Sequence, residues 1–186
     1  MHYLKYISLV TTLSFYVLVG QNSKDEIWSN ENFSGLKFRS IGPAFMSGRI
    51  SDIAFHPDNE SIWYVTVGSG NVWKTVNSGV TWTPIFDDQN SYSIGCVTID
   101  PNNPNTVWVG TGENLGGRHF GYGDGLYRSN DGGQSWVNMG LKKSEHISEV
   151  LIHPENSDVI WVASQGPMWS SGGQRGVYKS NDGGKS

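Results

Sequence analysis

Residues Ser129–Trp136 read Ser-Asn-Asp-Gly-Gly-Gln-Ser-Trp, and Ser180–Ser186 repeat them as Ser-Asn-Asp-Gly-Gly-Lys-Ser. An altered copy, Thr75–Trp82, precedes both and has Asn77 in place of the aspartate. In each copy a carboxylate or amide oxygen can accept hydrogen bonds from N–H groups of its own turn, while glycine adopts backbone conformations that other residues avoid. The pattern therefore predicts three equivalent tight turns.

Three short apolar segments precede each turn and are bounded by Gly, Pro, Asn and Asp. In the second copy they are Val97–Ile99, Val107–Val109 and Leu126–Arg128. Segments rich in Val, Ile, Trp and Tyr are typical of strands. Four strands in a repeat of about 40–50 residues indicate a β-propeller blade. We therefore predict an all-β fold, a β-propeller of which the chain supplies three consecutive four-stranded blades of an incomplete ring.

The repeats also predict the division of the chain. The expected parts are a signal peptide (1–20), a lead-in segment (21–48), blade 1 (49–92), blade 2 (93–145) and an incomplete blade 3 (146–186). The third copy stops at Ser186, before the tryptophan that follows in the other copies. Its fourth strand is thus expected to be missing. Because propellers usually close with roughly four to eight blades, we expect the rest of the ring to follow Ser186.

The first twenty residues are typical of an export signal. Lys5 precedes Ile7–Gly20, a run without charge that is shorter than the about 20 residues needed to span a bilayer. A short apolar run that ends in a small residue matches the core of a signal peptide, although a buried first strand is an alternative. We expect an exported protein, periplasmic, cell-surface or secreted, without a transmembrane segment in the mature chain.

Charge and cysteine content exclude several classes of protein. Lys and Arg number 13 against 17 Asp and Glu, which gives a formal net charge of −4 and no electrostatic drive toward nucleic acid. A single cysteine, Cys96, excludes an intrachain disulfide framework and a multi-cysteine metal site. We expect Cys96 to be a small buried side chain, and we expect no cofactor and no bound metal.

The repeated turn resembles the Asp-box, or BNR, repeat of bacterial sialidases, xyloglucanase-type glycoside hydrolases, photosystem assembly factors and the sortilin family. Phe38–Pro43, Gly48–Ile50 and Trp82–Asp88 are similar to the start of large exported bacterial proteins related to the sortilin N-terminal domain, often labelled glycosyl hydrolase-like. The resemblance covers Leu36–Ser186 and implies a propeller fold. It implies structural roles in the turns for Asn77, Gly79, Trp82, Asp131, Gly133, Trp136, Asp182 and Gly184.

The blade pattern assigns the loops to two faces. Turns between the first and second strands, and between the third and fourth, share one face; the remaining loops and the starts of the first strands share the other. Two loops of the second face, Thr111–Asp124 and Gln165–Arg175, are long, and long loops on a rigid scaffold commonly carry function. The candidate ligand-binding residues on this loop-rich face are Arg49, Asp52, Asn114, Arg118, His119, His146, Trp169 and Arg175.

Two functions remain open. The first is a sortilin-like binding module of a larger protein that recognises a peptide, protein or polysaccharide, with Trp169 as a stacking residue and Arg49–Asp52 either binding the ligand or forming a structural ion pair. The alternative is a glycoside hydrolase, in which two carboxylates flank the scissile bond. The resemblance to xyloglucanase-type enzymes implies an acid after the second strand of an early blade, but Val67–Asn71 contains none. The tentative catalytic acids are Glu113, Asp124 and Glu149.

Overall fold

The computed structural model describes residues 35–36, 48–114 and 121–186. The chain forms two compact units, Met1–Ile41 and Gly42–Ser186, and every strand of the described residues lies in the second unit. The described residues contain no helix, and therefore none that could cross a membrane. The expected signal peptide and nearly all of the lead-in segment lie outside the described residues.

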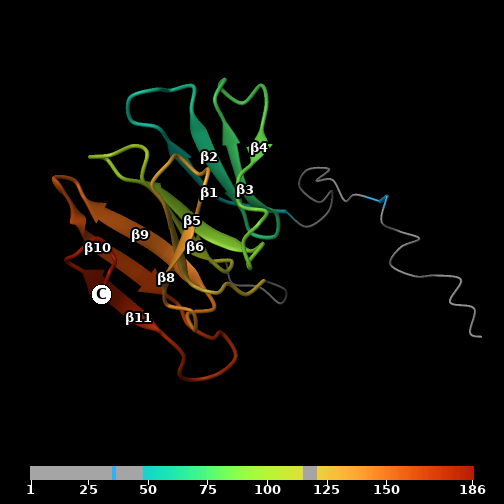
Figure 1. Ribbon diagram of the computed structural model, residues 1–186. Helices are drawn as coiled ribbons and strands as arrows, with labels where there is room; N and C mark the ends of the chain where they lie inside the picture. The colour runs from blue at the N-terminus through green and yellow to red at the C-terminus, as the bar shows by residue number, and fades with distance from the viewer. Residues whose placement is uncertain (1–34, 37–47, 115–120) are drawn as a thin grey trace, which may run out of the picture. The chain divides into compact units, whose positions relative to one another are not determined.

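Three antiparallel sheets make up the second unit (Figure 1). The first sheet contains β1 (Ile50–Phe55), β2 (Trp63–Val67), β3 (Asn71–Thr75) and β4 (Thr83–Pro84). The second contains β5 (Ile94–Ile99), β6 (Val107–Thr111), β7 (Leu126–Ser129) and β8 (Val137–Gly140). The third contains β9 (Ile147–His153), β10 (Asn156–Ser164) and β11 (Gly176–Ser180). Strands pair in chain order, so the predicted all-β fold is confirmed, including a third sheet of three strands.

The three sheets share one strand register. Equivalent pairs on the first two strands of each sheet are Ile53–Val65, Val97–Val109 and Val150–Val162. Each first strand also contains an irregularity near its start, where the pairing skips one residue: Ser51, Gly95 and Ser148. A bulge of this kind redirects the side chains that flank it, so the starts of the first strands differ from regular alternation.

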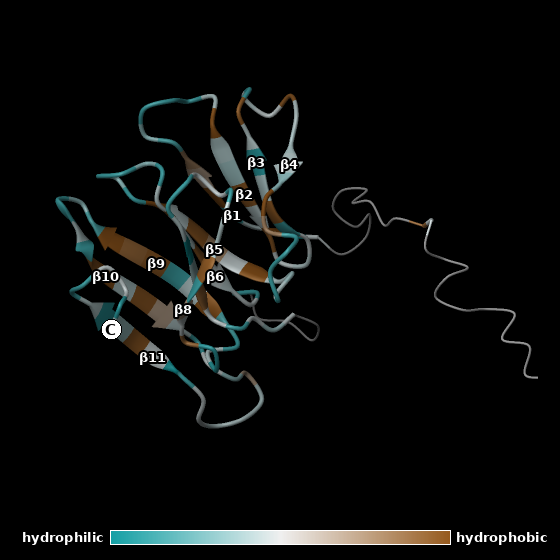
Figure 2. Ribbon diagram, viewed as in Figure 1, coloured by the Kyte–Doolittle hydropathy of each residue, from teal (hydrophilic) through white to brown (hydrophobic). Residues whose placement is uncertain are grey.

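Neighbouring sheets pack face to face through apolar side chains. Figure 2 shows hydrophobic residues on strands of all three sheets. Tyr64 and Val72 of the first sheet pack with Val109 of the second. Trp108 of the second sheet packs with Val150 of the third. Among the first strands, β5 contacts both β1 and β9. Burial of each aliphatic side chain stabilises the stack by about 1.5–3 kcal/mol.

The tryptophan after the second turn joins two sheets. Nε1 of Trp136 donates a 2.7 Å hydrogen bond to the carbonyl of Ile85, and its ring meets Phe86 edge to face at 5.1 Å. The equivalent Trp82 of the first sheet is 38% exposed and lies beside Trp63, 6.2 Å between ring centroids. Strand β8 begins at Val137, directly after this tryptophan. The indole therefore belongs to the junction with the preceding sheet.

Each repeated turn is closed by its own acid or amide. Oδ1 of Asp131 accepts hydrogen bonds from the N–H groups of Gln134 and Ser135, both at 2.9 Å, and from the hydroxyl of Ser129 at 2.7 Å. The Ser135 hydroxyl donates to Oδ2 at 2.5 Å, and these bonds, led by that of Ser135, lower the pKa of Asp131 to about 2. Asp182 is bonded in the same way, so the two turns are structurally equivalent.

The first turn shows the consequence of its altered sequence. Oδ1 of Asn77 accepts from the N–H of Thr81 at 2.9 Å, as the aspartates do in the other copies. Ser78, however, has a φ of 56°, and the equivalent residues Gly132 and Gly183 both have a φ of 68°. A left-handed backbone is costly for a residue with a Cβ, so the first turn retains its geometry under strain.

Candidate ligand-binding site

The starts of the first strands form one structural column on the loop-rich face. In each sheet the residue that follows the second strand donates its N–H to the carbonyl of the residue directly before the first strand. The pairs are Gly68–Arg49 (2.8 Å), Gly112–Ser93 (2.7 Å) and Gln165–His146 (2.9 Å). Arg49, Ser93 and His146 are thus equivalent positions in three neighbouring blades.

Glu113 connects all three members of this column. Its Oε1 accepts a 2.6 Å hydrogen bond from Nε of Arg49 and also pairs with the terminal guanidinium nitrogen. Its N–H donates to Oγ of Ser93 at 3.0 Å, and its carbonyl lies 2.9 Å from Nδ1 of His146. Glu113 is 2% exposed, whereas the Arg49 side chain is 51% exposed. One buried acid therefore binds residues from three blades.

Gly68 leaves the space that the Glu113 carboxylate occupies. A Cβ at Gly68 would lie 2.5 Å from Oε1 of Glu113, which is closer than two such atoms approach. Gly68 lies within Val67–Asn71, the stretch that carries no acid of its own. A carboxylate nevertheless reaches this point, because the following blade supplies Glu113.

His146 adds a neutral ring to the group. The ring is fully buried, and burial lowers its pKa despite the opposing effect of nearby Glu145 and Glu113. A carbonyl can only accept, so the neutral ring carries its proton on Nδ1 and donates to Glu113. Tyr122, which is 56% exposed, lies beside it at 5.4 Å between centroids. Arg49 and Glu113 therefore provide the charges at the centre of the group.

Two buried oxygens at this point have no donor in the part of the chain that the structure describes. Oε2 of Glu113 and Oδ1 of Asn114 have no hydrogen-bond partner among the described residues. The carbonyl of Asn114 accepts from Nε2 of Gln165 at 3.2 Å, which ties the site to the third blade. Buried acceptors are normally satisfied, so a donor group of a ligand would stabilise this arrangement. Two further candidates, Arg118 and His119, lie outside the described residues.

Asp52 has a structural position. Its Oδ1 accepts from the N–H of Ile53 at 2.8 Å, and its Oδ2 accepts from the N–H of Val97 in the next blade at 3.0 Å. Within the residues that the structure describes, Arg49 pairs with Glu113 and not with Asp52, so the ion pair considered from sequence is wrong. The pairing skips Ser51 in β1, and the two side chains take separate partners on blade 2.

The long loop of the third blade is braced against the connection before it. Gln174 donates its N–H to the carbonyl of Lys143 at 3.1 Å and accepts the Lys143 N–H at 2.8 Å. The Arg175 guanidinium donates to the carbonyl of Pro167 in its own loop. Trp169 is 72% exposed in this loop. Arg175 therefore shapes the loop, while Trp169 offers an aromatic surface.

The tentative catalytic acids have different surroundings. Glu113 is paired with Arg49, and Oδ2 of Asp124 accepts the hydroxyl of Tyr127 at 2.7 Å. Glu149 is exposed on β9; partial burial and the nearby Asp52 carboxylate raise its pKa. The association of Glu149 with Asp52 had no sequence signal beyond their shared place in the repeat.

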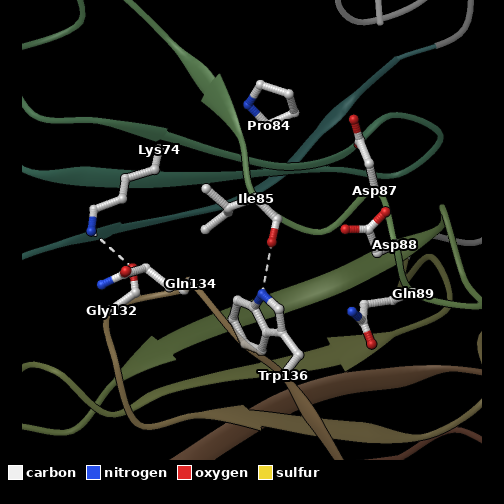
Figure 3. A pocket seen from close by; sticks show the side chains of 10 residues that line it. Lys74, Pro84, Ile85, Asp87, Asp88, Gln89, Gly132, Gln134 and Trp136 are labelled. Carbon is white, nitrogen blue, oxygen red and sulfur yellow. Dashed lines mark hydrogen bonds between the residues drawn. The ribbon is translucent and has the colours of Figure 1, made fainter. Parts of the chain in front are cut away.

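A cavity of about 530 Å³ lies where the first and second sheets meet (Figure 3). Lys74, Asp87, Asp88 and Trp136 line it, and hydrogen bonds join the lining residues Lys74 to Gly132 and Trp136 to Ile85. No pattern in the sequence predicts this cavity, because its lining residues come from two blades. Within the described ranges, no group of three or more His, Cys, Asp or Glu could hold a metal ion.

Solved structures with the same arrangement are β-propellers. The chain is similar to an ancestral GH74 enzyme (20% identity over 77% of this chain and 18% of that one, TM-score 0.57). It is similar to a GH74 enzyme of Niastella koreensis (26% identity, 68% and 19%, TM-score 0.52). It is also similar to YCF48 from Cyanidioschyzon merolae (19% identity, 76% and 37%, TM-score 0.50).

These structural similarities establish the β-propeller fold. The chain is a set of three consecutive propeller blades, and its open sheets form an incomplete ring. It spans less than a fifth of the length of both GH74 enzymes. No model of a protein family matches the sequence, and no curated protein matches it. The resemblance to sortilin-related exported proteins remains a prediction.

Proposed function

We propose that the chain is part of an exported β-propeller that binds a peptide, protein or polysaccharide on its loop-rich face. The observation that carries this proposal is the convergence of Arg49, Glu113 and His146 from three blades into one hydrogen-bonded group. The loop that bears Trp169 is joined to Asn114, next to Glu113, by a hydrogen bond from Gln165, and it provides further contact surface. Binding requires no positioned acid and base, and Glu113 is already held in an ion pair.

The chemistry of the group indicates a polar ligand. The half-exposed guanidinium of Arg49 offers donors, while Oε2 of Glu113 and Oδ1 of Asn114 offer buried acceptors. Peptide backbones and sugar hydroxyls present both donors and acceptors. The exposed indole of Trp169 can stack on a sugar ring or pack against a side chain. A ligand of either kind would engage the centre and the rim of the face together.

Peptide and glycan arrays test the proposal with the whole protein. We expect a selective ligand whose affinity falls about tenfold or more in Trp169→Ala, as for an aromatic anchor, and also falls in Arg49→Ala. Phe55→Ala is the matched control, because Phe55 is an exposed aromatic residue at the other end of its strand. Ligand affinity unchanged in both site variants, or no selective ligand on either array, would contradict the proposal.

A glycoside hydrolase is the second candidate, favoured by one observation. Glu149 has a raised pKa beside the Asp52 carboxylate, and paired carboxylates with different environments are typical of acid–base catalysis. The Niastella koreensis protein that the chain resembles is a GH74 enzyme. Release of reducing sugar from a panel of polysaccharides, abolished by Glu149→Gln, would support this candidate. An intact panel would exclude it.

We also propose export of the protein through its first twenty residues. The charge-free run Ile7–Gly20 after Lys5 supports this proposal. Expression from the native start codon in a bacterial host should give a mature protein whose N-terminus lies near Gln21. N-terminal sequencing of the cell fractions tests this, and an uncleaved cytoplasmic product would contradict it.

A further inference from the structure

A cation lies over an aromatic ring at the same place in all three blades. The pairs join the second and third strands: Lys74 over Tyr64 (5.2 Å), Arg128 over Trp108 (5.5 Å) and Lys179 over Trp161 (5.4 Å). Cation–π contacts of this kind fix a long side chain in one direction. The pairs therefore form a structural repeat that is separate from the Asp-box turn itself.

The first two pairs hold the turn of the next blade. Nζ of Lys74 donates to the carbonyl of Gly132 at 2.8 Å (Figure 3). The hydroxyl of Tyr64 donates to the same oxygen at 3.1 Å. One blade later, a terminal guanidinium nitrogen of Arg128 donates to the carbonyl of Gly183 at 2.8 Å. Each accepting glycine directly follows the aspartate of its turn.

The geometry of the turn explains why this carbonyl is available. Asp131 binds the N–H groups of its own turn, and Gly132 takes a left-handed conformation. Partial burial lowers the pKa of Lys74, and the nearby Asp131 carboxylate opposes this shift. Lys74 of the preceding blade therefore binds the Gly132 carbonyl and lies near the Asp131 carboxylate.

The third pair has no such turn among the described residues. Lys179 is exposed on β11, and apolar side chains beside it on the same sheet are exposed too, with Leu151 at 56% and Val177 at 76%. The equivalent surface of the second sheet, around Trp108 and Leu126, is covered by the third blade. The site on the third blade is thus formed and open.

We propose that the Lys179–Trp161 pair is the docking site for the Asp-box turn of a further blade of the same chain. Lys179 donates to the carbonyl of the residue that follows the aspartate of that turn, and Leu151 and Val177 pack beneath the new sheet. In the same way, Lys74 of blade 1 holds the turn of blade 2, and Arg128 of blade 2 holds the turn of blade 3. A second copy of the chain is a poorer fit, because the turn of its blade 1 offers the uncharged Asn77 in place of an aspartate.

Amine labelling of the whole protein tests this proposal. Acetylation is followed residue by residue by mass spectrometry at several protein concentrations. We expect Lys179 to react several-fold more slowly than the exposed Lys142, as Lys74 should, and at a rate that does not depend on protein concentration. Labelling of Lys179 as fast as that of Lys142 would overturn the proposal. Protection that appears only at high protein concentration would assign the site to a second copy and overturn it too.

Substitution then tests the contact itself. Lys179→Met should lower the melting temperature of the whole protein to the same degree as Lys74→Met, while Lys179→Arg should retain it, because Arg128 makes the equivalent bond. Lys142→Met is the matched control and should have no effect. A melting temperature unchanged by Lys179→Met would show that no turn is bound there.

Discussion

Arg49, at the start of the first blade, donates a 2.6 Å hydrogen bond from Nε to Oε1 of Glu113, sixty-four residues later in the second blade. The acid is buried and the arginine is half-exposed. The bond joins two blades at the place where the first strands begin. It also holds the two charged groups in position on the loop-rich face, where we propose that the ligand binds.

Arg49→Met should destabilise the protein. The substitution leaves the buried Glu113 carboxylate without its cation, which costs about 1–3 kcal/mol in the free energy of unfolding. Denaturant unfolding of wild type, Arg49→Met, Glu113→Gln and the double variant measures the coupling between the two side chains. The double variant should be more stable than the sum of the two single effects predicts. Strict additivity would mean that the pair contributes nothing.

Asp131→Asn should change how stability depends on pH. The folded-state pKa of Asp131 is about 2, below the value of about 3.9 in an unfolded chain. Its contribution is therefore complete above the unfolded value and is lost as the pH falls through about 2. The difference in unfolding free energy between wild type and Asp131→Asn should shrink from pH 5 to pH 2 (about the range over which these pKa values act).

Ser135→Ala is the comparison variant for the pH dependence that we expect of Asp131. The Ser135 hydroxyl makes the largest contribution to the low pKa of Asp131, so its loss should remove part of the same pH dependence. A difference between wild type and Asp131→Asn that stays constant over the acid range would contradict the assignment.

Ser78→Gly should stabilise the first blade. Ser78 has a φ of 56°, a conformation that costs a residue with a Cβ about 1–2 kcal/mol, whereas glycine loses about 0.5–1 kcal/mol more in the unfolded chain. The net gain expected is about 0.5–1 kcal/mol, measured by thermal or denaturant unfolding. Ser78→Ala keeps the strain and should give no gain. Equal stability of the glycine and alanine variants would argue against strain at this turn.

Cys96 should be unreactive in the folded protein. The side chain is 1% exposed, and burial, with the nearby Glu149 carboxylate, raises its pKa far above the ordinary thiol value. The thiolate is the reactive form, so a thiol reagent at pH 8 (about half a unit below the ordinary thiol pKa) should label it only after unfolding in denaturant. Rapid labelling without denaturant would show that the junction between blades 2 and 3 opens readily.

The sequence by itself determined the repeated strands and turns. Asp131 binds partners within four residues of itself, so the turn is encoded where it occurs. Three copies of one strand pattern predict three sheets in the same register, as the structure shows. Such interactions are local, so residues that are close in the sequence are enough to predict them.

The tertiary structure alone decided which residues meet across blades. Arg49 meets Glu113, Asp52 binds the N–H of Val97, and Lys74 binds the carbonyl of Gly132. Partners in these contacts lie 45 to 64 residues apart. These contacts depend on the residue skipped in the pairing of β1, on the absence of a side chain at Gly68, and on the face-to-face packing of the sheets. No short stretch of sequence encodes these conditions, because each arises only when separate strands pack in three dimensions.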